Sequence, residues 1–370
     1  MDFLLSEDQT LLKNSVARFC ADQAKAPADE RRWAQMAGLG LLGMTFDEDH
    51  GGMGAGAPEV MIVAEEMGRH LLTDPFVQAV AIAGRLIDAA GSAAQKDALL
   101  PAIAEGRLVV VPAFGEPGSR YDLARVAATA TADGGGHVLN GRKAVVLYGA
   151  AAHSLLVSAR VSGAVDAPDG IALFLVDARA PGLMVRACET LDGRPAAEVT
   201  LDRVRVGADA LLGPPGGAFG LLEHAADRGV AAVCGEAVGA MAALYDMTVE
   251  FLRTRRQFGR PLGAFQALQH RVVDMRTALE LARSMAAAAA IAADLDDAGE
   301  RRRIVSAAKV QVDRSGRAIG AQAIQLHGAM GMTEEYGAGR YVKRLLVLSS
   351  LYGDADHHTD RYQAATGLAA

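Results

Sequence analysis

The chain has 370 residues, which is enough for two or three packed layers or domains around a large core. Its hydrophobic fraction of 51% is ordinary for a globular protein, and its net charge of −7 argues against a nucleic-acid partner, because no basic stripe dominates. The alanine-rich run at 286–293 is apolar but too short to span a membrane, so no membrane partner is expected.

The cysteines and the N-terminus bear on the expected cellular location and on metal binding. Cys20, Cys188 and Cys234 are odd in number, scattered, and lack the spacing of a metal site. No basic stretch followed by an apolar core opens the chain, so we expect no secretory signal. A reduced cytoplasm suits such a chain. We therefore predict a cytoplasmic protein with no metal.

Residues 1–108 are predicted to form an N-terminal helical domain. Ser6 and Gln9 have the spacing of a capping box, and apolar residues follow at helical intervals. A loop containing Asp49-His50-Gly51-Gly52-Met53-Gly54 interrupts this pattern before it resumes. We assign no role to His50 within that loop.

Residues 109–212 change to short alternating or apolar runs separated by Gly, Pro, Asp or Asn. This pattern is typical of antiparallel strands, so we predict a β domain. Asn140-Gly141 between two such runs is a strong hairpin signal.

Residues 213–370 return to helical periodicity after the Pro214–Gly217 boundary. Long helices are predicted from about Gly220 to Arg253, through Leu268–Ala282, and from about Ile304 to His327, as in an antiparallel four-helix bundle. The predicted fold is therefore α+β and mostly α. Gly235 and its small neighbours leave room for a bulky ligand or permit close helix packing.

Two segments carry side chains that suit a dinucleotide. Arginine forks suit phosphates, glutamine suits the edge of a heterocycle, and glycine lets the backbone approach a ligand. Arg255 could instead pair with a carboxylate, and Phe258 could belong to the core. Taken together, the segments indicate a cradle for FAD. The cradle residues are Arg255, Gln257, Phe258, Phe265 and Gln266 in a turn between helices, and Gln325 and Gly328 at the end of a later helix.

The order of these motifs resembles that of the acyl-CoA dehydrogenases over nearly the whole chain. No single motif decides this, but six in the right order make chance agreement improbable. They are Asp49–Gly54, Gly115-Glu116-Pro117-Gly118-Ser119, Leu139-Asn140-Gly141-Arg142-Lys143, Val204-Arg205-Val206 with Leu211-Leu212-Gly213, Arg255–Gln266, and Gln325–Met332.

The resemblance implies FAD-dependent oxidation of an acyl-CoA thioester to the 2-enoyl-CoA. A base removes the α-proton while the β-hydrogen leaves as hydride to flavin N5. An electron-transfer flavoprotein is the implied acceptor, and a tetramer the implied assembly. In the family, residues at the Arg255, Gln257 and Phe258 positions hold the FAD pyrophosphate and adenine of a neighbouring subunit, and Gln325 and Gly328 match the second part of that cradle.

The flavin-ring pocket and the base depart from the family pattern. Gly115 replaces a threonine or serine that reaches the flavin ring. Gly353 replaces the usual catalytic glutamate, and the position that some relatives use instead falls on Gly229. Glu236 lies two turns later on the same helix face and is our first candidate for the base, with a buried ion pair or interface carboxylate as the alternative. Asp354 is the fallback.

Three interpretations stay open at this stage. The chain could be an active homotetrameric dehydrogenase with Glu236 as base. It could be a subunit of a heteromeric enzyme that completes a partner's FAD site, since its closing region resembles the small subunits of pimeloyl-CoA-type or sterol side-chain dehydrogenases. It could also be a silent structural or acyl-CoA-binding member. The acids and histidines of 354–360 indicate a helix start rather than a metal site.

Overall fold

The computed structural model describes residues 4–24 and 29–367. They form two compact units, one comprising Met1–Pro27, Ala57–Thr73 and Val230–Ala370 and the other Ala28–Gly56 and Asp74–Gly229. The predicted order of a helical first segment, a β middle segment and a helical last segment is confirmed. We call the first unit the bundle unit and the second the sheet unit.

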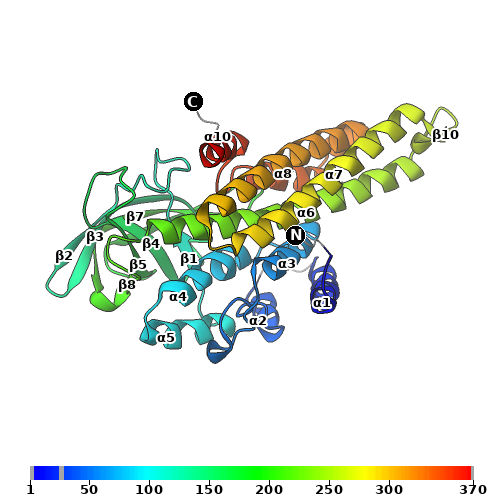
Figure 1. Cartoon of the computed structure of the whole chain (residues 1–370). Helices are drawn as coiled ribbons and strands as arrows, with labels where there is room; N and C mark the ends of the chain where they lie inside the picture. The colour runs from blue at the N-terminus through cyan, green and yellow to red at the C-terminus, as the bar shows by residue number, and fades with distance from the viewer. Residues whose placement is uncertain (1–3, 25–28, 368–370) are drawn as a thin grey trace. The chain divides into compact units, whose positions relative to one another are not determined.

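Long helices dominate the bundle unit. In Figure 1, α6, α7 and α8 run side by side, and the β9–β10 hairpin forms the turn between α6 and α7. The elements are α1 (Glu7–Gln23), α3 (Ala57–Arg69), α6 (Phe219–Thr254, which begins in the sheet unit), β9 (Arg256–Gln257), β10 (Arg260–Pro261), η4 (Leu262–Ala264), α7 (Gln266–Ala293), α8 (Ala298–His327), η5 (Gly328–Met332), α9 (Ala338–Leu348) and α10 (Ala355–Thr366).

Side-chain caps fix several helix starts. The capping box of Ser6 and Gln9 is present at α1, as predicted. Helix α8 begins at Ala298, earlier than the predicted start near Ile304, because the Asp297 carboxylate accepts the first free backbone N–H groups. Asp354 caps α10 in the same way, which confirms the predicted helix start.

Glycine and alanine let the bundle helices approach closely. A Cβ on Gly239 of α6 would lie 1.8 Å from the Glu65 carbonyl oxygen of α3, and one on Gly235 would lie 2.7 Å from the Met61 side chain. Gly235 therefore serves helix packing. Further along, small buried side chains bring α3, α6, α7 and α8 together; they are Ala57, Ala231, Ala289, Ala290, Ala293 and Ala308.

Helix α6 is the one helix, within the described residues, that is long and apolar enough to cross a membrane. Its apolar window is 83% buried inside the protein. The apolar character of α6 thus reflects its place in the core.

The sheet unit places short helices beside an eight-stranded sheet. Its helices are α2 (Glu30–Gly38), η1 (Glu48–His50), the π-helical η2 (Val77–Gly84), α4 (Arg85–Ala90), α5 (Ala93–Ala104) and η3 (Ala208–Ala210). Its strands are β1 (Val110–Ala113), β2 (Thr129–Asp133), β3 (Gly136–Leu147), β4 (Ser154–Arg160), β5 (Ile171–Asp177), β6 (Leu183–Glu189), β7 (Pro195–Gly207) and β8 (Leu211–Leu212).

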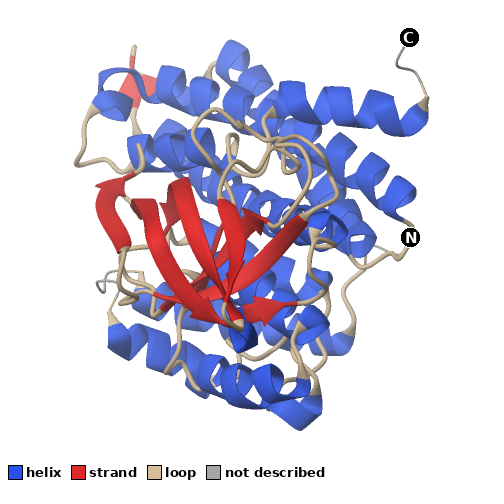
Figure 2. Ribbon diagram, turned by 90° about the vertical axis from the view of Figure 1, so that its left-hand side faces the viewer, coloured by secondary structure: helices blue, strands red, loops and turns tan. Residues whose placement is uncertain are grey.

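The strands of this large sheet are drawn in red in Figure 2. They run in the order β6-β7-β3-β2-β4-β5-β8, and β1 pairs parallel to β4. Most neighbouring pairs are antiparallel, as the sequence pattern predicts. The core of this unit includes Leu155, Leu173 and Phe174, which are fully buried.

The predicted hairpin at Asn140-Gly141 is wrong. Both residues lie inside the continuous strand β3, where the register with β7 shifts between Leu139 and Gly141. The actual turn between β2 and β3 is Gly134-Gly135, where both residues have positive φ (57° and 100°). Asn140 uses its side-chain oxygen to accept the Arg203 backbone N–H across the bulge.

Candidate functional site

The β9–β10 hairpin presents most of the predicted cradle residues to solvent. Arg255, Gln257 and Phe258 are exposed, and the Phe258 side chain is 87% exposed at a φ of 53°. A phenylalanine held in the left-handed region at the tip of a hairpin is a costly arrangement for a ring with no core to enter. The hairpin is therefore built for contact with another molecule.

The alternatives weighed for Arg255 and Phe258 do not describe this geometry. No ion pair involves Arg255 within the part of the chain that the structure describes, and Phe258 lies outside the core. Phe258 instead meets Phe265 edge to face, with ring centroids 6.1 Å apart. The Arg260 guanidinium lies 4.0 Å from the centroid of the Phe265 ring. The β9–β10 hairpin and the residues after it thus place a cationic side chain beside two aromatic rings.

The second cradle segment lies at the same end of the bundle as the hairpin. The ring of Phe251, one turn before Arg255, lies 4.6 Å from the ring of His327 at the end of α8. Gln325 and Gly328 are both exposed there, and a Cβ on Gly328 would meet nothing within 4 Å. The structure therefore brings the two predicted halves of the cradle together.

His327 supports this end of the bundle. Its Nδ1 donates to the Ala323 carbonyl oxygen at 2.8 Å, and its Nε2 lies 3.2 Å from the Tyr336 hydroxyl. Burial lowers the pKa of His327, which keeps the ring neutral so that Nε2 can accept the Tyr336 proton. These two bonds fix the last turn of α8 directly before Gly328.

Glu236, the first candidate for the base, forms a buried ion pair with Arg344 of α9. The Arg344 Nε and Nη2 donate to Oε1 and Oε2 of Glu236 at 2.8 and 2.7 Å. Glu236 is 3% exposed and Arg344 is 4% exposed. A bidentate guanidinium stabilises the ionised carboxylate and engages both of its oxygens. A buried ion pair was the alternative predicted for Glu236, but the sequence did not identify Arg344 as the partner, because it lies 108 positions away.

The Gly353 position disfavours the family's glutamate, because its backbone conformation suits glycine and two imidazoles lie against it. Gly353 has a φ of 116°, and a Cβ there would lie 2.5 Å from His358 Nε2 and 2.6 Å from His357 Cδ2. Asp354, the fallback candidate, accepts the His357 backbone N–H at 2.9 Å as the cap of α10. Two imidazoles thus lie where a side chain at position 353 would begin, and the Asp354 carboxylate is already engaged in capping α10.

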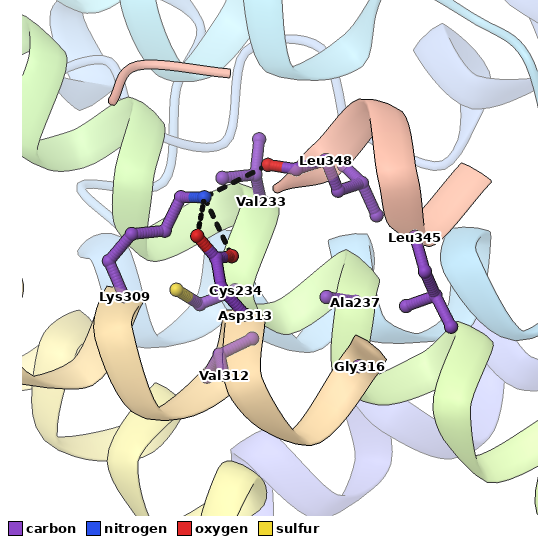
Figure 3. A pocket seen from close by; sticks show the side chains of 9 residues that line it. All are labelled: Val233, Cys234, Ala237, Lys309, Val312, Asp313, Gly316, Leu345 and Leu348. Carbon is purple, nitrogen blue, oxygen red and sulfur yellow. Dashed lines mark hydrogen bonds and ion pairs between the residues drawn. The ribbon is translucent and has the colours of Figure 1, made fainter. Parts of the chain in front are cut away.

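A buried charged pair fixes the segment that leads to Gly353. Lys309 and Asp313 of α8 face each other beside a small cavity that Cys234 also lines (Figure 3). Lys309 Nζ donates to Asp313 Oδ1 at 2.7 Å. Lys309 Nζ also donates to the carbonyl oxygens of Leu348 and Ser349, at the end of α9. Burial raises the pKa of the Cys234 thiol to about 12, so this thiol is not a nucleophile at neutral pH.

The loop at Gly115–Ser119 is held by a second buried network. Lys143 Nζ donates to Glu116 Oε1 at 2.7 Å and to Ser158 Oγ at 3.0 Å. The Glu116 carboxylate also accepts the backbone N–H groups of Ala127 and Ala128. Burial lowers the pKa of Lys143 to about 8, against the opposing effect of Glu116. Sequence reasoning included Glu116 and Lys143 in family motifs but did not predict their contact.

The residues expected beside a flavin ring offer few polar groups. Gly115 is exposed and has no side chain, and Val145 is 62% exposed at a φ of 52°, in the second register shift of β3. Val146 and Leu147 turn into the core. Val145, Val146 and Leu147 therefore supply apolar surface and no hydroxyl group.

Comparison with known proteins agrees with this architecture. Three family profiles match in order: the N-terminal domain of acyl-CoA dehydrogenases over residues 6–107, the middle domain over 112–204, and the C-terminal domain over 219–366. The chain belongs to the acyl-CoA dehydrogenase family.

Individual relatives cover almost the whole chain. Acyl-CoA dehydrogenase FadE12 of Mycobacterium tuberculosis is 33% identical, over 90% of this chain and 89% of its own. The probable acyl-CoA dehydrogenase YngJ of Bacillus subtilis is 28% identical, over 93% of each. Among solved structures, a variant of the Tcur3481-Tcur3483 steroid ACAD is 32% identical with a TM-score of 0.87, over 98% of each chain.

Proposed function

We propose that this chain acts in FAD-dependent oxidation of an acyl-CoA thioester as one subunit of a heteromeric enzyme, sharing an active site with an unlike neighbouring subunit. One contrast carries the proposal. The cradle side chains other than the half-buried Phe265 are exposed, and Arg255 has no ion pair among the described residues. Glu236, in contrast, is held by Arg344, and imidazoles occupy the space beside Gly353. The chain is thus equipped to hold a dinucleotide but poorly equipped to supply its own base.

The chemistry of the cradle fits FAD. The Arg255 guanidinium can bind the pyrophosphate, and the amides of Gln257 and Gln325 can bind the edge of the adenine. Phe258, backed by Phe265, offers an aromatic face, and Gly328 admits close approach of the backbone. Gln266 adds a further exposed amide. When bound, FAD supplies the acceptor for the substrate's β-hydride.

Glu236 remains the chain's own candidate base, as a second proposal. A base must accept the α-proton, so Glu236 could serve only where substrate binding frees at least one oxygen from Arg344. Asp354 is subject to a similar condition, since it caps α10. A homotetramer with Glu236 as base would need this rearrangement in every subunit.

Family membership supports our proposals for the substrate class and the acceptor, and the cysteines support the proposed location. An acyl-CoA is the expected substrate, and the similarity to a steroid ACAD favours a bulky acyl chain. An electron-transfer flavoprotein is the expected acceptor, and a hetero-tetramer the expected assembly. The free thiols of Cys20, Cys188 and Cys234 fit a cytoplasmic setting.

The visible spectrum of the purified chain tests the proposal. We expect a colourless protein alone, and about one flavin per pair after co-expression with an acyl-CoA dehydrogenase encoded beside it. Arg255→Met should lower the flavin content of that pair, whereas Arg253→Met, which changes an exposed arginine half a turn earlier, should not. Near one flavin per chain in the isolated protein, with bleaching by acyl-CoA, would refute the shared site.

The same spectrum tests Glu236 as base. If the isolated chain does bind flavin, Glu236→Gln should keep the flavin and abolish bleaching by acyl-CoA. Retained bleaching would remove Glu236 from consideration.

A further inference from the structure

Three potential metal ligands meet in the sheet unit, outside the cradle. They are Asp47 and His50, which begin and end the turn around η1, and Asp88 of α4. One ligand atom from each lies within 4.8 Å of the others. Sequence spacing did not indicate this group, because the third ligand comes from a separate helix.

Asp88 is the buried member of the group. It is 3% exposed, and its Oδ2 pairs with Arg85. Its Oδ1 is also buried but has no hydrogen-bond partner. A buried carboxylate oxygen without a donor is unfavourable, because it has lost its water and gained nothing in return. A cation bound beside this oxygen would supply the missing partner.

His50 presents a matching unused nitrogen. Its Nε2 lies 3.3 Å from Asp97 Oδ1, while its Nδ1 is buried and has no hydrogen-bond partner. Because the Asp97 carboxylate can only accept, Nε2 carries a hydrogen, which leaves Nδ1 as the nitrogen that can face a cation. A histidine oriented through one nitrogen by a carboxylate, with the other nitrogen open, is the usual arrangement of a metal ligand.

Asp47 completes the group from the solvent side. It occupies the N-cap position of η1, yet its side chain makes no capping hydrogen bond. Asp47 is exposed, and one of its carboxylate oxygens lies within 4.8 Å of a potential ligand atom of His50 and of Asp88. The glycines that follow fix the loop: Gly51 has a φ of 80°, and a Cβ on Gly52 would lie 2.0 Å from the Phe46 carbonyl oxygen.

We propose that Asp47, His50 and Asp88 bind one divalent first-row transition cation, with Zn²⁺ as the reference ion. Two carboxylates and one imidazole are a ligand set that Zn²⁺ accepts, with water in the remaining position. Asp97 orients His50 from behind, and Arg85 keeps the other oxygen of Asp88. The bound ion ties the η1 loop to α4, and through Asp97 to α5, so its role is to fix this loop.

The main alternative is that these three side chains lie close together without binding any ion. The two cases respond differently, because only a bound cation makes the stability of the η1 loop depend on Zn²⁺ concentration at fixed pH.

Calorimetric titration of Zn²⁺ into the chelator-treated, tag-free full-length protein tests the site. We expect one saturable site per chain and a higher melting temperature with Zn²⁺. Asp47→Ala should weaken binding at least 10-fold, and Asp97→Asn by about 10–100-fold, as for other residues that orient a ligand. Asp49→Ala removes a neighbouring exposed carboxylate and should change nothing.

Asp47 carries the decisive test because it is exposed, so its replacement leaves the core intact, whereas Asp88→Asn alters a buried group. Three results would overturn the site: no saturable binding near one ion per chain, equal affinities of Asp47→Ala and Asp49→Ala, or a melting temperature that does not respond to Zn²⁺. Flavin content does not enter this test, so its failure leaves the proposed function unaffected.

Discussion

Arg344→Met should strongly destabilise the bundle unit, because it leaves the Glu236 carboxylate buried without its guanidinium. Two charge-assisted hydrogen bonds of 2.8 and 2.7 Å are lost, and such bonds contribute about 1.5–3 kcal/mol each. Breaking a buried ion pair by removing one partner costs about 3–5 kcal/mol, so the two figures agree. We expect a loss of this size in the free energy of unfolding.

The double variant Glu236→Leu with Arg344→Met should recover most of that loss. Two apolar side chains of similar volume need no partner, and replacing a buried pair in this way is often neutral or stabilising by about 1–4 kcal/mol. A double-mutant cycle from urea unfolding midpoints gives the coupling energy directly.

Arg69→Met provides the control for this cycle. Arg69 pairs with Asp246 at the surface, where the two side chains are 40% and 54% exposed, so its loss should cost about 0–1 kcal/mol. If Arg344→Met lowered the free energy of unfolding no more than Arg69→Met does, the Glu236–Arg344 pair would not be a buried ion pair. Arg344 would then not hold the Glu236 carboxylate.

Three further results are expected. Gly239→Ala should lower the free energy of unfolding by about 1–3 kcal/mol, because the new methyl group clashes with α3. Gly220→Ala is the control: its Cβ would meet nothing within 4 Å, so urea unfolding should show a neutral or slightly stabilising effect. Burial lowers the pKa of His358 to about 3, below the value of about 6.5 in an unfolded chain, so stability should fall by about 1.4 kcal/mol per unit as pH drops below 6.5. His358→Asn should reduce that slope, which unfolding at pH 7 and 5 will measure; an unchanged slope would contradict a neutral buried ring. Gly353→Glu should lower the melting temperature without giving acyl-CoA-dependent bleaching, and a gain of bleaching would show that the imidazoles there move aside.

The helices were predictable because their signals are local. The capping box at Ser6 and the cap at Asp354 depend on residues three positions apart. The β-hairpin failed for a related reason: Asn140-Gly141 has the composition of a tight turn, but pairing with β7 on both sides of it outweighed that preference. Gly134-Gly135 could have been recognised as an equally strong turn signal.

The two cradle segments could be selected from the sequence because each is short and contiguous, and their role in binding FAD stays a prediction. The buried pairs could not be selected in this way. Lys143 meets Glu116 across 27 positions and Arg344 meets Glu236 across 108, and no sequence period links such partners. A buried charge implies a partner, but sequence alone does not say which opposite charge supplies it.

The division of the chain between the two compact units has a consequence for biosynthesis. Helix α3 emerges from the ribosome early. It packs closely against Gly235 and Gly239 of α6, but that part of α6 is made only after the sheet unit has been synthesised. Until then α1 is the helix of its own unit already available to pack on α3, and the side of α3 that meets Gly235 and Gly239 stays uncovered. Closing so long a loop is slow, and exposed apolar surface during that delay favours aggregation. Added chaperones during synthesis should therefore raise the soluble yield of this chain.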